Sequence, residues 1–177
     1  MLKPIHLDHD WIAAHIPHQG SMCLLDCVEA WDEERIQCRA TSHRKPDNPL
    51  RSNDRLSSVC GIEYAAQAMA VHGALLAPKD STAARAGFLV SIRGTQLHVL
   101  RLDDIAADLT VEATCISRGE NNILYQFKVS ADNQLLLEGR AAVVLDADAI
   151  FPASRSDTTS LSGGEAGERE RTQGGII

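Results

Sequence analysis

The segment SSVCGIEYAAQAMAVHGALLA, residues 57–77, decides how this chain is expected to fold. It consists largely of alanine and other good helix formers, which predicts one helix over its whole length. Apolar or small residues recur at helical spacing at Val59, Ile62, Ala66, Met69, Gly73 and Leu76. The other faces are apolar as well, so the rest of the domain must wrap this helix. A glutamate and a histidine interrupt it, which favours the centre of a folded domain over a membrane.

Glu63 is the one formal charge in this segment. A lone carboxylate on an apolar helix loses hydration, which costs several kcal/mol unless a partner compensates it. Such a carboxylate can serve catalysis, or it can form a structural ion pair with Arg51, Arg55 or a histidine. Gln67 lies one helical turn further on the same face, where it can support the carboxylate or satisfy buried backbone groups.

The start of the predicted helix is a second candidate feature. Ser57 and Ser58 are good N-cap residues, and the first turn of a helix has free backbone N–H groups. Such groups can hold the oxygen of a thioester or ester carbonyl. The N–H groups from Ser58 to Gly61 are therefore predicted to form an oxyanion site about one turn before Glu63.

Composition narrows the class of protein. With 177 residues, 44% of them hydrophobic, the chain can form one ordinary domain. The net charge of -7 disfavours a nucleic-acid or anionic-membrane surface. Five cysteines without paired spacing, and no secretory leader, predict reduced thiols in the cytoplasm. They do not form a zinc pattern, and no metal or organic cofactor is expected.

The flanking sequence predicts one short helix and several strands. The helix covers residues 6–15, and strands are predicted over 22–31, 35–41, 88–102, 108–117, 122–131 and 134–146. The last four are expected to form an antiparallel meander with one apolar face, which the central helix covers. From residue 152 onward the composition is polar and small, so we expect a domain over residues 1–150 and a disordered tail over 151–177.

This order of elements resembles the hotdog fold, an α+β fold in which a curled antiparallel sheet wraps one long helix. The segment IPHQGSMCLLDCV, residues 16–28, resembles the Pro-His and Leu-Leu-Asp-Arg-Val opening of β-hydroxyacyl-acyl-carrier-protein dehydratases. GIEYAAQAM, residues 61–69, is similar to their central-helix Glu-Ala-Met-Ala-Gln signature. The nearest resemblance is to the divergent dehydratases of aryl-polyene biosynthesis clusters, which share the Asn-Pro-Leu-Arg loop found here at residues 48–51.

The resemblance implies that Glu63 is the catalytic carboxylate. The loop before the helix lacks the Gly-His-Phe-Pro histidine of the common family, so another imidazole is needed. His18 is predicted to act as the base, because imidazole titrates near neutral pH, with Glu63 protonating the departing hydroxyl. His43, in the loop before the helix, is the alternative. A Pro-His turn can equally be structural.

The implied activity is dehydration of 3-hydroxyacyl thioesters on acyl-carrier protein to trans-2-enoyl thioesters, in fatty-acid-like or aryl-polyene biosynthesis. A hotdog acyl thioesterase and a non-catalytic acyl-binding or scaffold subunit of a dehydratase complex remain alternatives. The expected partners are an acyl-carrier protein bearing a 3-hydroxyacyl chain and a second hotdog subunit, in a homodimer or heterodimer. Because carrier proteins are acidic, basic residues of the 44–55 segment, Arg85, Arg93 and Arg101 are candidates for docking.

Overall fold

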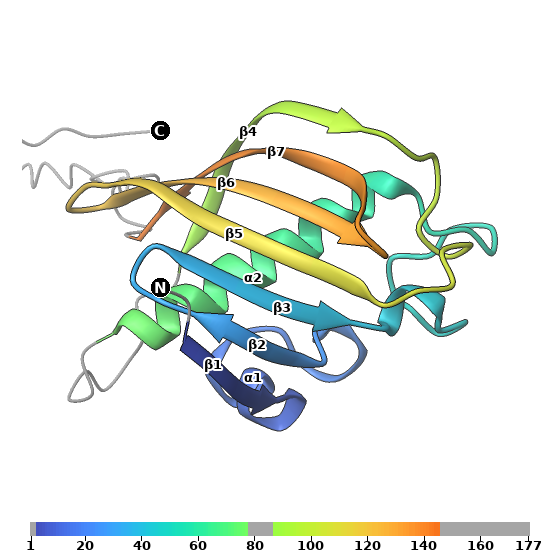
Figure 1. Ribbon diagram of the computed structural model, residues 1–177, viewed down its shortest axis with the longest axis horizontal. Coiled ribbons are helices and arrows are strands. Elements are labelled where there is room, and N and C mark those ends of the chain that lie inside the picture. The colour runs from blue at the N-terminus through green and yellow to red at the C-terminus, as the bar shows by residue number, and fades with distance from the viewer. Residues whose placement is uncertain (1–2, 78–86, 146–177) are drawn as a thin grey trace, which may run out of the picture.

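A seven-stranded antiparallel sheet curls around one long helix (Figure 1). The computed structural model describes residues 3–77 and 87–145, so the tail predicted over 151–177 lies outside the described residues. The strands are β1 (Lys3–Asp8), β2 (Cys27–Trp31), β3 (Arg35–Ala40), β4 (Phe88–Leu97), β5 (Leu109–Arg118), β6 (Asn122–Ala131) and β7 (Gln134–Val144). The helices are α1 (His9–His15) and α2 (Gly61–Leu76), with short 3-10 helices η1 (Gly20–Met22), η2 (Ser42–Arg44) and η3 (Ser58–Cys60). The architecture confirms the expected α+β hotdog arrangement.

The core lies between α2 and the inner face of the sheet. Along β6 the burial alternates, with Tyr125 and Phe127 buried and Gln126 exposed, as the sequence pattern predicts. At the start of the helix, a Cβ atom added to Gly61 would lie 2.5 Å from Leu137 Cδ2. Gly61 therefore lets α2 approach β7 closely.

The N-terminal region differs from the prediction in one element. Residues 3–8 form a strand that no sequence pattern predicts, and the helix expected from residue 6 begins at His9. Asp8 is its N-cap, with Oδ1 accepting a hydrogen bond from the Trp11 N–H at 2.9 Å. The helix ends at His15, ahead of Pro17 as expected.

Two strand predictions also need correction. The strand expected over 22–31 begins only at Cys27, because residues 20–22 form a 3-10 helix with Gly20 at φ 57°. The last four strands do not form a simple meander. β5 pairs with β3 and β6, so β4 pairs with β7 alone and lies at the far edge of the sheet.

The central helix is shorter than predicted at its start. Residues 58–60 form a 3-10 turn and the α-helix begins at Gly61; the Ser57 side chain makes no capping hydrogen bond. Residues 58–76 form the one helical stretch of the described chain that is long and apolar enough to cross a membrane. The central helix of a folded domain has the same properties, and eight residues of α2 are buried here.

Candidate active site

The structure brings His18 and Glu63 into direct contact. His18 Nε2 lies 3.1 Å from Glu63 Oε1, and the two side chains are 26% and 31% exposed. His18 lies in the turn after α1, and Glu63 in the first turn of α2. The dyad is thus accessible from solvent at the edge of the core, where a substrate can reach it.

Gln67 connects this dyad to the segment that follows His18. Its side chain is fully buried, and its Nε2 donates to Glu63 Oε1 at 3.0 Å and to the Met22 carbonyl at 2.7 Å. Its Oε1 accepts from the Leu24 N–H at 2.8 Å. Gln67 therefore has both of the roles expected for it, since it hydrogen-bonds the Glu63 carboxylate and also satisfies buried backbone groups.

The surroundings of His18 determine which ring nitrogen carries the proton. Nδ1 is buried and has no hydrogen-bond partner among the described residues, whereas Nε2 faces the carboxylate. A proton on Nδ1 would leave a buried donor unsatisfied, which costs about 1–3 kcal/mol. The favoured tautomer therefore carries its proton on Nε2, which donates to Glu63 Oε1. That oxygen then accepts two N–H hydrogen bonds, and Oε2 accepts none from the described residues.

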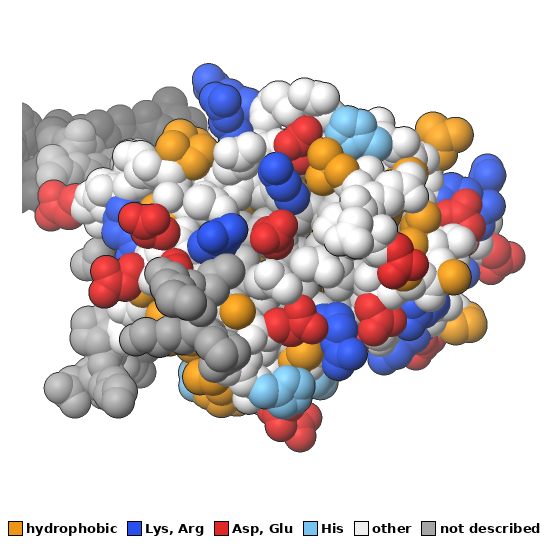
Figure 2. Space-filling view, viewed as in Figure 1, with side chains coloured by type: hydrophobic (Ala, Val, Ile, Leu, Met, Phe, Trp, Pro, Cys, Tyr) orange, Lys and Arg blue, Asp and Glu red, His pale blue; other side chains and the backbone are white. Residues whose placement is uncertain are grey.

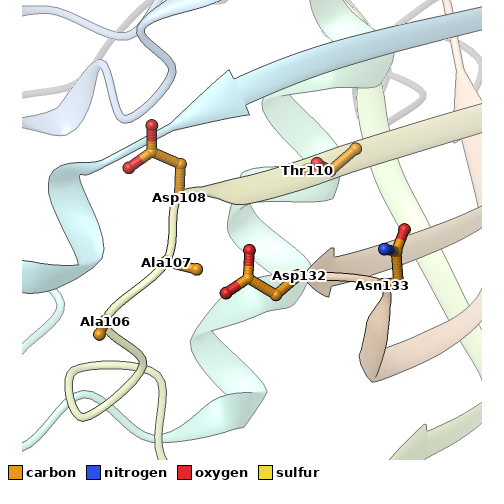
Figure 3. A pocket seen from close by; sticks show the side chains of 6 residues that line it. All are labelled: Ala106, Ala107, Asp108, Thr110, Asp132 and Asn133. Atoms are coloured by element: carbon orange, nitrogen blue, oxygen red, sulfur yellow. The ribbon is translucent and has the colours of Figure 1, made fainter.

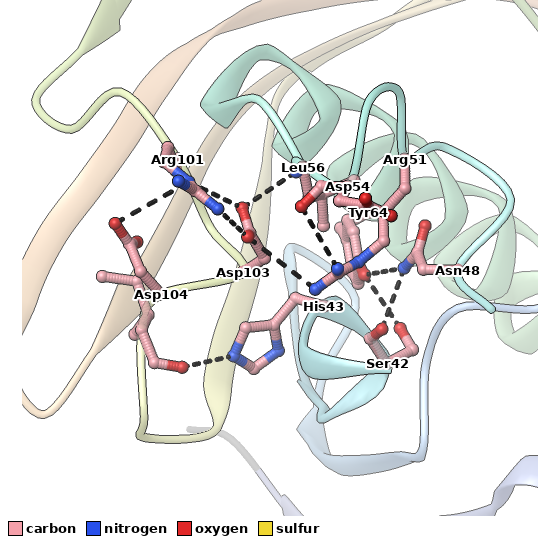
Figure 4. Close-up of polar contacts among 11 residues, drawn as sticks. Ser42, His43, Asn48, Arg51, Asp54, Leu56, Tyr64, Arg101, Asp103 and Asp104 are labelled. Atoms are coloured by element: carbon pink, nitrogen blue, oxygen red, sulfur yellow. Dashed lines mark hydrogen bonds and ion pairs between the residues drawn. The ribbon is translucent and has the colours of Figure 1, made fainter. Parts of the chain in front are cut away.

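A buried polar chain supports the other side of Leu24. Asn48 Nδ2 donates to Tyr64 Oη at 2.9 Å, and Tyr64 Oη donates to Ser42 Oγ at 2.9 Å (Figure 4). Ser42 Oγ in turn donates to the Leu24 carbonyl at 2.7 Å. Burial raises the pKa of Tyr64, which keeps its hydroxyl protonated. No sequence pattern singled out Ser42 or Tyr64 as part of the site. The only signal was a polar residue on an apolar helix.

His43, the alternative imidazole, lies elsewhere. It is fully buried, and its Nε2 donates to the Ile105 carbonyl at 3.1 Å (Figure 4). Burial lowers the pKa of its ring, so the ring is neutral. His43 anchors the loop after β4 through this hydrogen bond, whereas the imidazole in contact with Glu63 is that of His18.

The loop before the helix is held by a second polar group, Asp103, whose side chain is only 6% exposed. Its Oδ1 accepts from the Leu56 N–H at 2.8 Å, Arg101 pairs with both oxygens, and Arg51 Nη2 lies 3.8 Å from Oδ2 (Figure 4). The hydrogen bonds from Arg101 hold the pKa of Asp103 well below its usual range. Arg51 and Arg101, both predicted docking residues, are thus engaged inside the chain.

The predicted oxyanion site at Ser58 and Gly61 is corrected by the backbone hydrogen bonds. The Ser58 N–H donates to the Leu100 carbonyl at 3.1 Å, and the Gly61 N–H donates to the Ser58 carbonyl. The Cys60 N–H donates to Ser57 at 3.0 Å. These groups are occupied because the helix opens with a 3-10 turn pinned to the loop after β4. Val59 is the residue of this turn whose N–H takes no part in these bonds.

The described chain also has a surface pocket whose lining includes neither His18 nor Glu63. It measures about 660 Å³ and lies between the start of β5 and the β6–β7 turn (Figure 3). Two carboxylates, those of Asp108 and Asp132, line it, and that of Asp108 lies 2.7 Å from Arg44 Nη2 and 3.5 Å from Arg39 Nη1. Within residues 3–77 and 87–145, no group of three or more His, Cys, Asp or Glu side chains is arranged to hold a metal ion.

Comparisons with known proteins agree with this picture. Residues 11–151 match the family model described as ApeP-like, ApeP dehydratase. Among solved structures, the chain is similar to a chain of the dehydratase heterocomplex ApeI:P from Xenorhabdus doucetiae, with 21% identity over 82% of this chain and 95% of that chain and a TM-score of 0.70.

The chain is also similar to a thioesterase from Haemophilus influenzae, with 14% identity, coverage of 75% and 80%, and a TM-score of 0.51. A mutant thioesterase from Pseudomonas aeruginosa is similar as well, with 15% identity over 78% of this chain and 94% of that chain and a TM-score of 0.53. At these identities the structural matches show the shared hotdog fold alone. No curated protein sequence matches the chain.

Proposed function

Because this chain belongs to the ApeP-like dehydratase family, we propose that it removes water from 3-hydroxyacyl thioesters on acyl-carrier protein, giving trans-2-enoyl thioesters in fatty-acid-like or aryl-polyene biosynthesis. The observation that carries the proposal is the contact of 3.1 Å between His18 and Glu63. A carboxylate and an imidazole at this distance can share the proton transfers that elimination of water requires.

The hydrogen bonds support a division of roles that differs from the sequence-based hypothesis. There, His18 was the base; here its Nε2 already carries a proton, and its Nδ1 is buried. Glu63 Oε2 has the free lone pairs. We therefore assign to Glu63 the removal of the proton from the carbon next to the thioester carbonyl. The resulting carboxylic acid passes that proton to the departing hydroxyl, so water leaves and Glu63 is regenerated.

His18 and Val59 complete the proposed arrangement. The Nε2–H of His18 keeps the carboxylate oriented by its hydrogen bond to Oε1. Val59 precedes Glu63 by four residues, so its N–H lies about one helical turn from the carboxylate. That N–H is the remaining donor in the turn for the thioester oxygen, where negative charge develops.

The test uses a 3-hydroxyacyl chain on acyl-carrier protein, with the product read by intact-carrier mass spectrometry. The wild-type chain should give the mass of the dehydrated acyl group, and Glu63→Gln and His18→Ala should not. His15→Ala, an exposed histidine of α1, is the matched control and should retain activity. Release of the free carrier thiol would instead identify a thioesterase. Carrier binding without a mass change would identify a scaffold subunit.

His18→Gln separates the two assignments of the base. Glutamine retains an N–H donor toward Glu63 but cannot accept a proton at neutral pH. If Glu63 moves the proton, this variant should retain far more activity than His18→Ala. If both variants are equally inactive, His18 is the base and the assignment above is wrong.

A second hotdog subunit is proposed to pair along β4. This strand has a neighbour on one side only, and Phe88, Leu89, Val90 and Leu97 on it are each 40–48% exposed. A long apolar sheet edge readily pairs with a strand of another chain. The similar Xenorhabdus doucetiae protein was solved as a heterocomplex, which supports a different subunit as the partner.

Carrier docking is proposed to use Lys45 and Arg55. Both are exposed, and neither forms an ion pair with a described residue, whereas Arg44 is 2.7 Å from Asp108. An acidic carrier can therefore approach these two cations without breaking an internal pair. Arg85, also considered for docking, lies outside the described residues. Lys45→Glu with Arg55→Glu should raise the KM for the carrier-bound substrate while leaving turnover of a small acyl thioester unchanged.

A further inference from the structure

The middle of β4 carries a positive charge at the free edge of the sheet. Between Ser91 and Arg93 the pairing with β7 is regular, with Ile92 opposite Ala141 and Arg93 opposite Arg140. Ala141 is buried, so this pair faces the core, whereas Arg93 and Arg140 are both exposed on the outer face. Directly opposite residues of an antiparallel pair have Cβ atoms about 4.5–5.5 Å apart. Two guanidinium groups therefore lie side by side at this edge.

No carboxylate of the described chain is paired with either arginine. Arg93 Nε donates to Ser91 Oγ at 3.3 Å, and the next outward residue of β7, Glu138, lies 3.8 Å from His98 Nε2. Elsewhere on this face acidic and basic side chains are interspersed, and apolar side chains are visible near both ends of its upper edge (Figure 2). The edge thus combines apolar ends with an uncompensated positive centre.

Pairing of β4 with a second copy of itself would bring these charges together. A symmetric antiparallel pair must place core-facing residues opposite core-facing residues. The registers that pair most of the strand and meet this condition are centred on Ile92 or on Arg93. Centring on Arg93 puts the two Arg93 side chains directly opposite, and centring on Ile92 makes them diagonal neighbours. In both registers Arg93 and Arg140 from each copy surround the two-fold axis, and like charges there are destabilising.

We propose that Arg93 and Arg140 select against a self-paired dimer, and that β4 is the docking edge for a different hotdog subunit whose edge strand presents a carboxylate opposite Arg93. The inference rests on the pairing along β4 given above as part of the proposed function. It adds the chemistry that chooses the partner: apolar contact at the ends of the strand and an acidic residue at its centre. Discrimination by charge against the wrong partner is a common device at interfaces.

The test replaces the unknown partner with a charge-reversed copy of this chain. Wild-type chain is mixed with an Arg93→Glu variant that carries a mass tag, and homodimers and mixed dimers are quantified by native mass spectrometry and sedimentation equilibrium. The mixed dimer should have a Kd at least about tenfold lower than that of the wild-type homodimer, the equivalent of about 1.4 kcal/mol. Arg35→Glu, an exposed arginine on the same face of β3, is the matched control and should change nothing.

Salt provides the second readout. Raising the ionic strength screens exposed charges, so it should tighten the wild-type homodimer and weaken the mixed dimer. The proposal would be overturned by a wild-type homodimer as tight as the mixed dimer, or by a homodimer that weakens and a mixed dimer that tightens as salt is raised. If Arg93→Glu does not fold, Arg93→Gln gives the answer, because removal of the charge should tighten self-association. These measurements read assembly alone, so failure of the dehydratase proposal would leave them intact.

Discussion

Replacing Gln67 with leucine should destabilise the fold far more than the removal of one exposed polar side chain would. The buried amide makes three hydrogen bonds, to Glu63, to the Met22 carbonyl and from the Leu24 N–H. Leucine is similar in volume but leaves the two backbone groups without partners, and Leu24 is only 1% exposed. Each buried unsatisfied group costs about 1–3 kcal/mol. We therefore expect the free energy of unfolding to fall by about 3 kcal/mol.

Urea unfolding followed by tryptophan fluorescence measures this effect. Trp11 in α1 and Trp31 in β2 lie in elements on either side of the 22–24 segment. With a dependence on urea of about 2 kcal/mol per molar, typical of small domains, the midpoint should drop by about 1.5 M. Gln126→Leu, on the exposed face of β6, is the control and should change stability by less than about 0.5 kcal/mol.

A Gln67→Leu midpoint within the range of this control would refute the reasoning. It would mean that the backbone at Met22 and Leu24 is satisfied without the amide. The connection between the central helix and the segment after His18 would then not depend on Gln67.

Two further predictions concern pH and glycine. Burial lowers the pKa of both His43 and His72, so the unfolded chain binds protons below about pH 6.5 that the folded chain does not, and the free energy of unfolding should decrease as pH falls from there. In His72→Gln the limiting slope, measured by urea titration between pH 5 and 6.5, should be smaller by up to about 1.4 kcal/mol per pH unit. Gly61→Ala should destabilise by about 1–3 kcal/mol, because its Cβ meets Leu137 Cδ2 at 2.5 Å. Gly73→Ala, whose Cβ has no atom within 4 Å, should stabilise α2 by about 0.5–1 kcal/mol, and urea unfolding measures both glycine variants.

The central helix and its carboxylate could be predicted because their signals are local. Helical periodicity marks residues 57–77, and the four-residue spacing of Glu63 and Gln67 places both on one face before any coordinates are known. The contact of His18 with Glu63 spans 45 residues of sequence, and only the resemblance of two motifs to a known family connected them. Periodicity alone does not say which turn lies over which helix face.

The features that could not be predicted depend on pairing between distant segments. β4 has an ordinary strand pattern, but its place beside β7 follows from β3 taking the position next to β5. The same limit applies to the occupied N–H groups of Ser58 and Gly61. Free N–H groups are a general property of a helix start. Whether they are used depends on the loop after β4, which supplies the Leu100 carbonyl.

Leu24 shows how the central helix positions the segment that follows His18. Its N–H is held by Gln67, and its carbonyl by Ser42, which in turn accepts from Tyr64. Gln67 and Tyr64 both belong to α2, as does Glu63. One rigid helix therefore carries the carboxylate and also fixes, through two independent polar links, the segment that follows His18. A contact such as the 3.1 Å between His18 and Glu63 is held more precisely when packed supporting residues fix both partners, and the polar residues of this apolar helix provide that support.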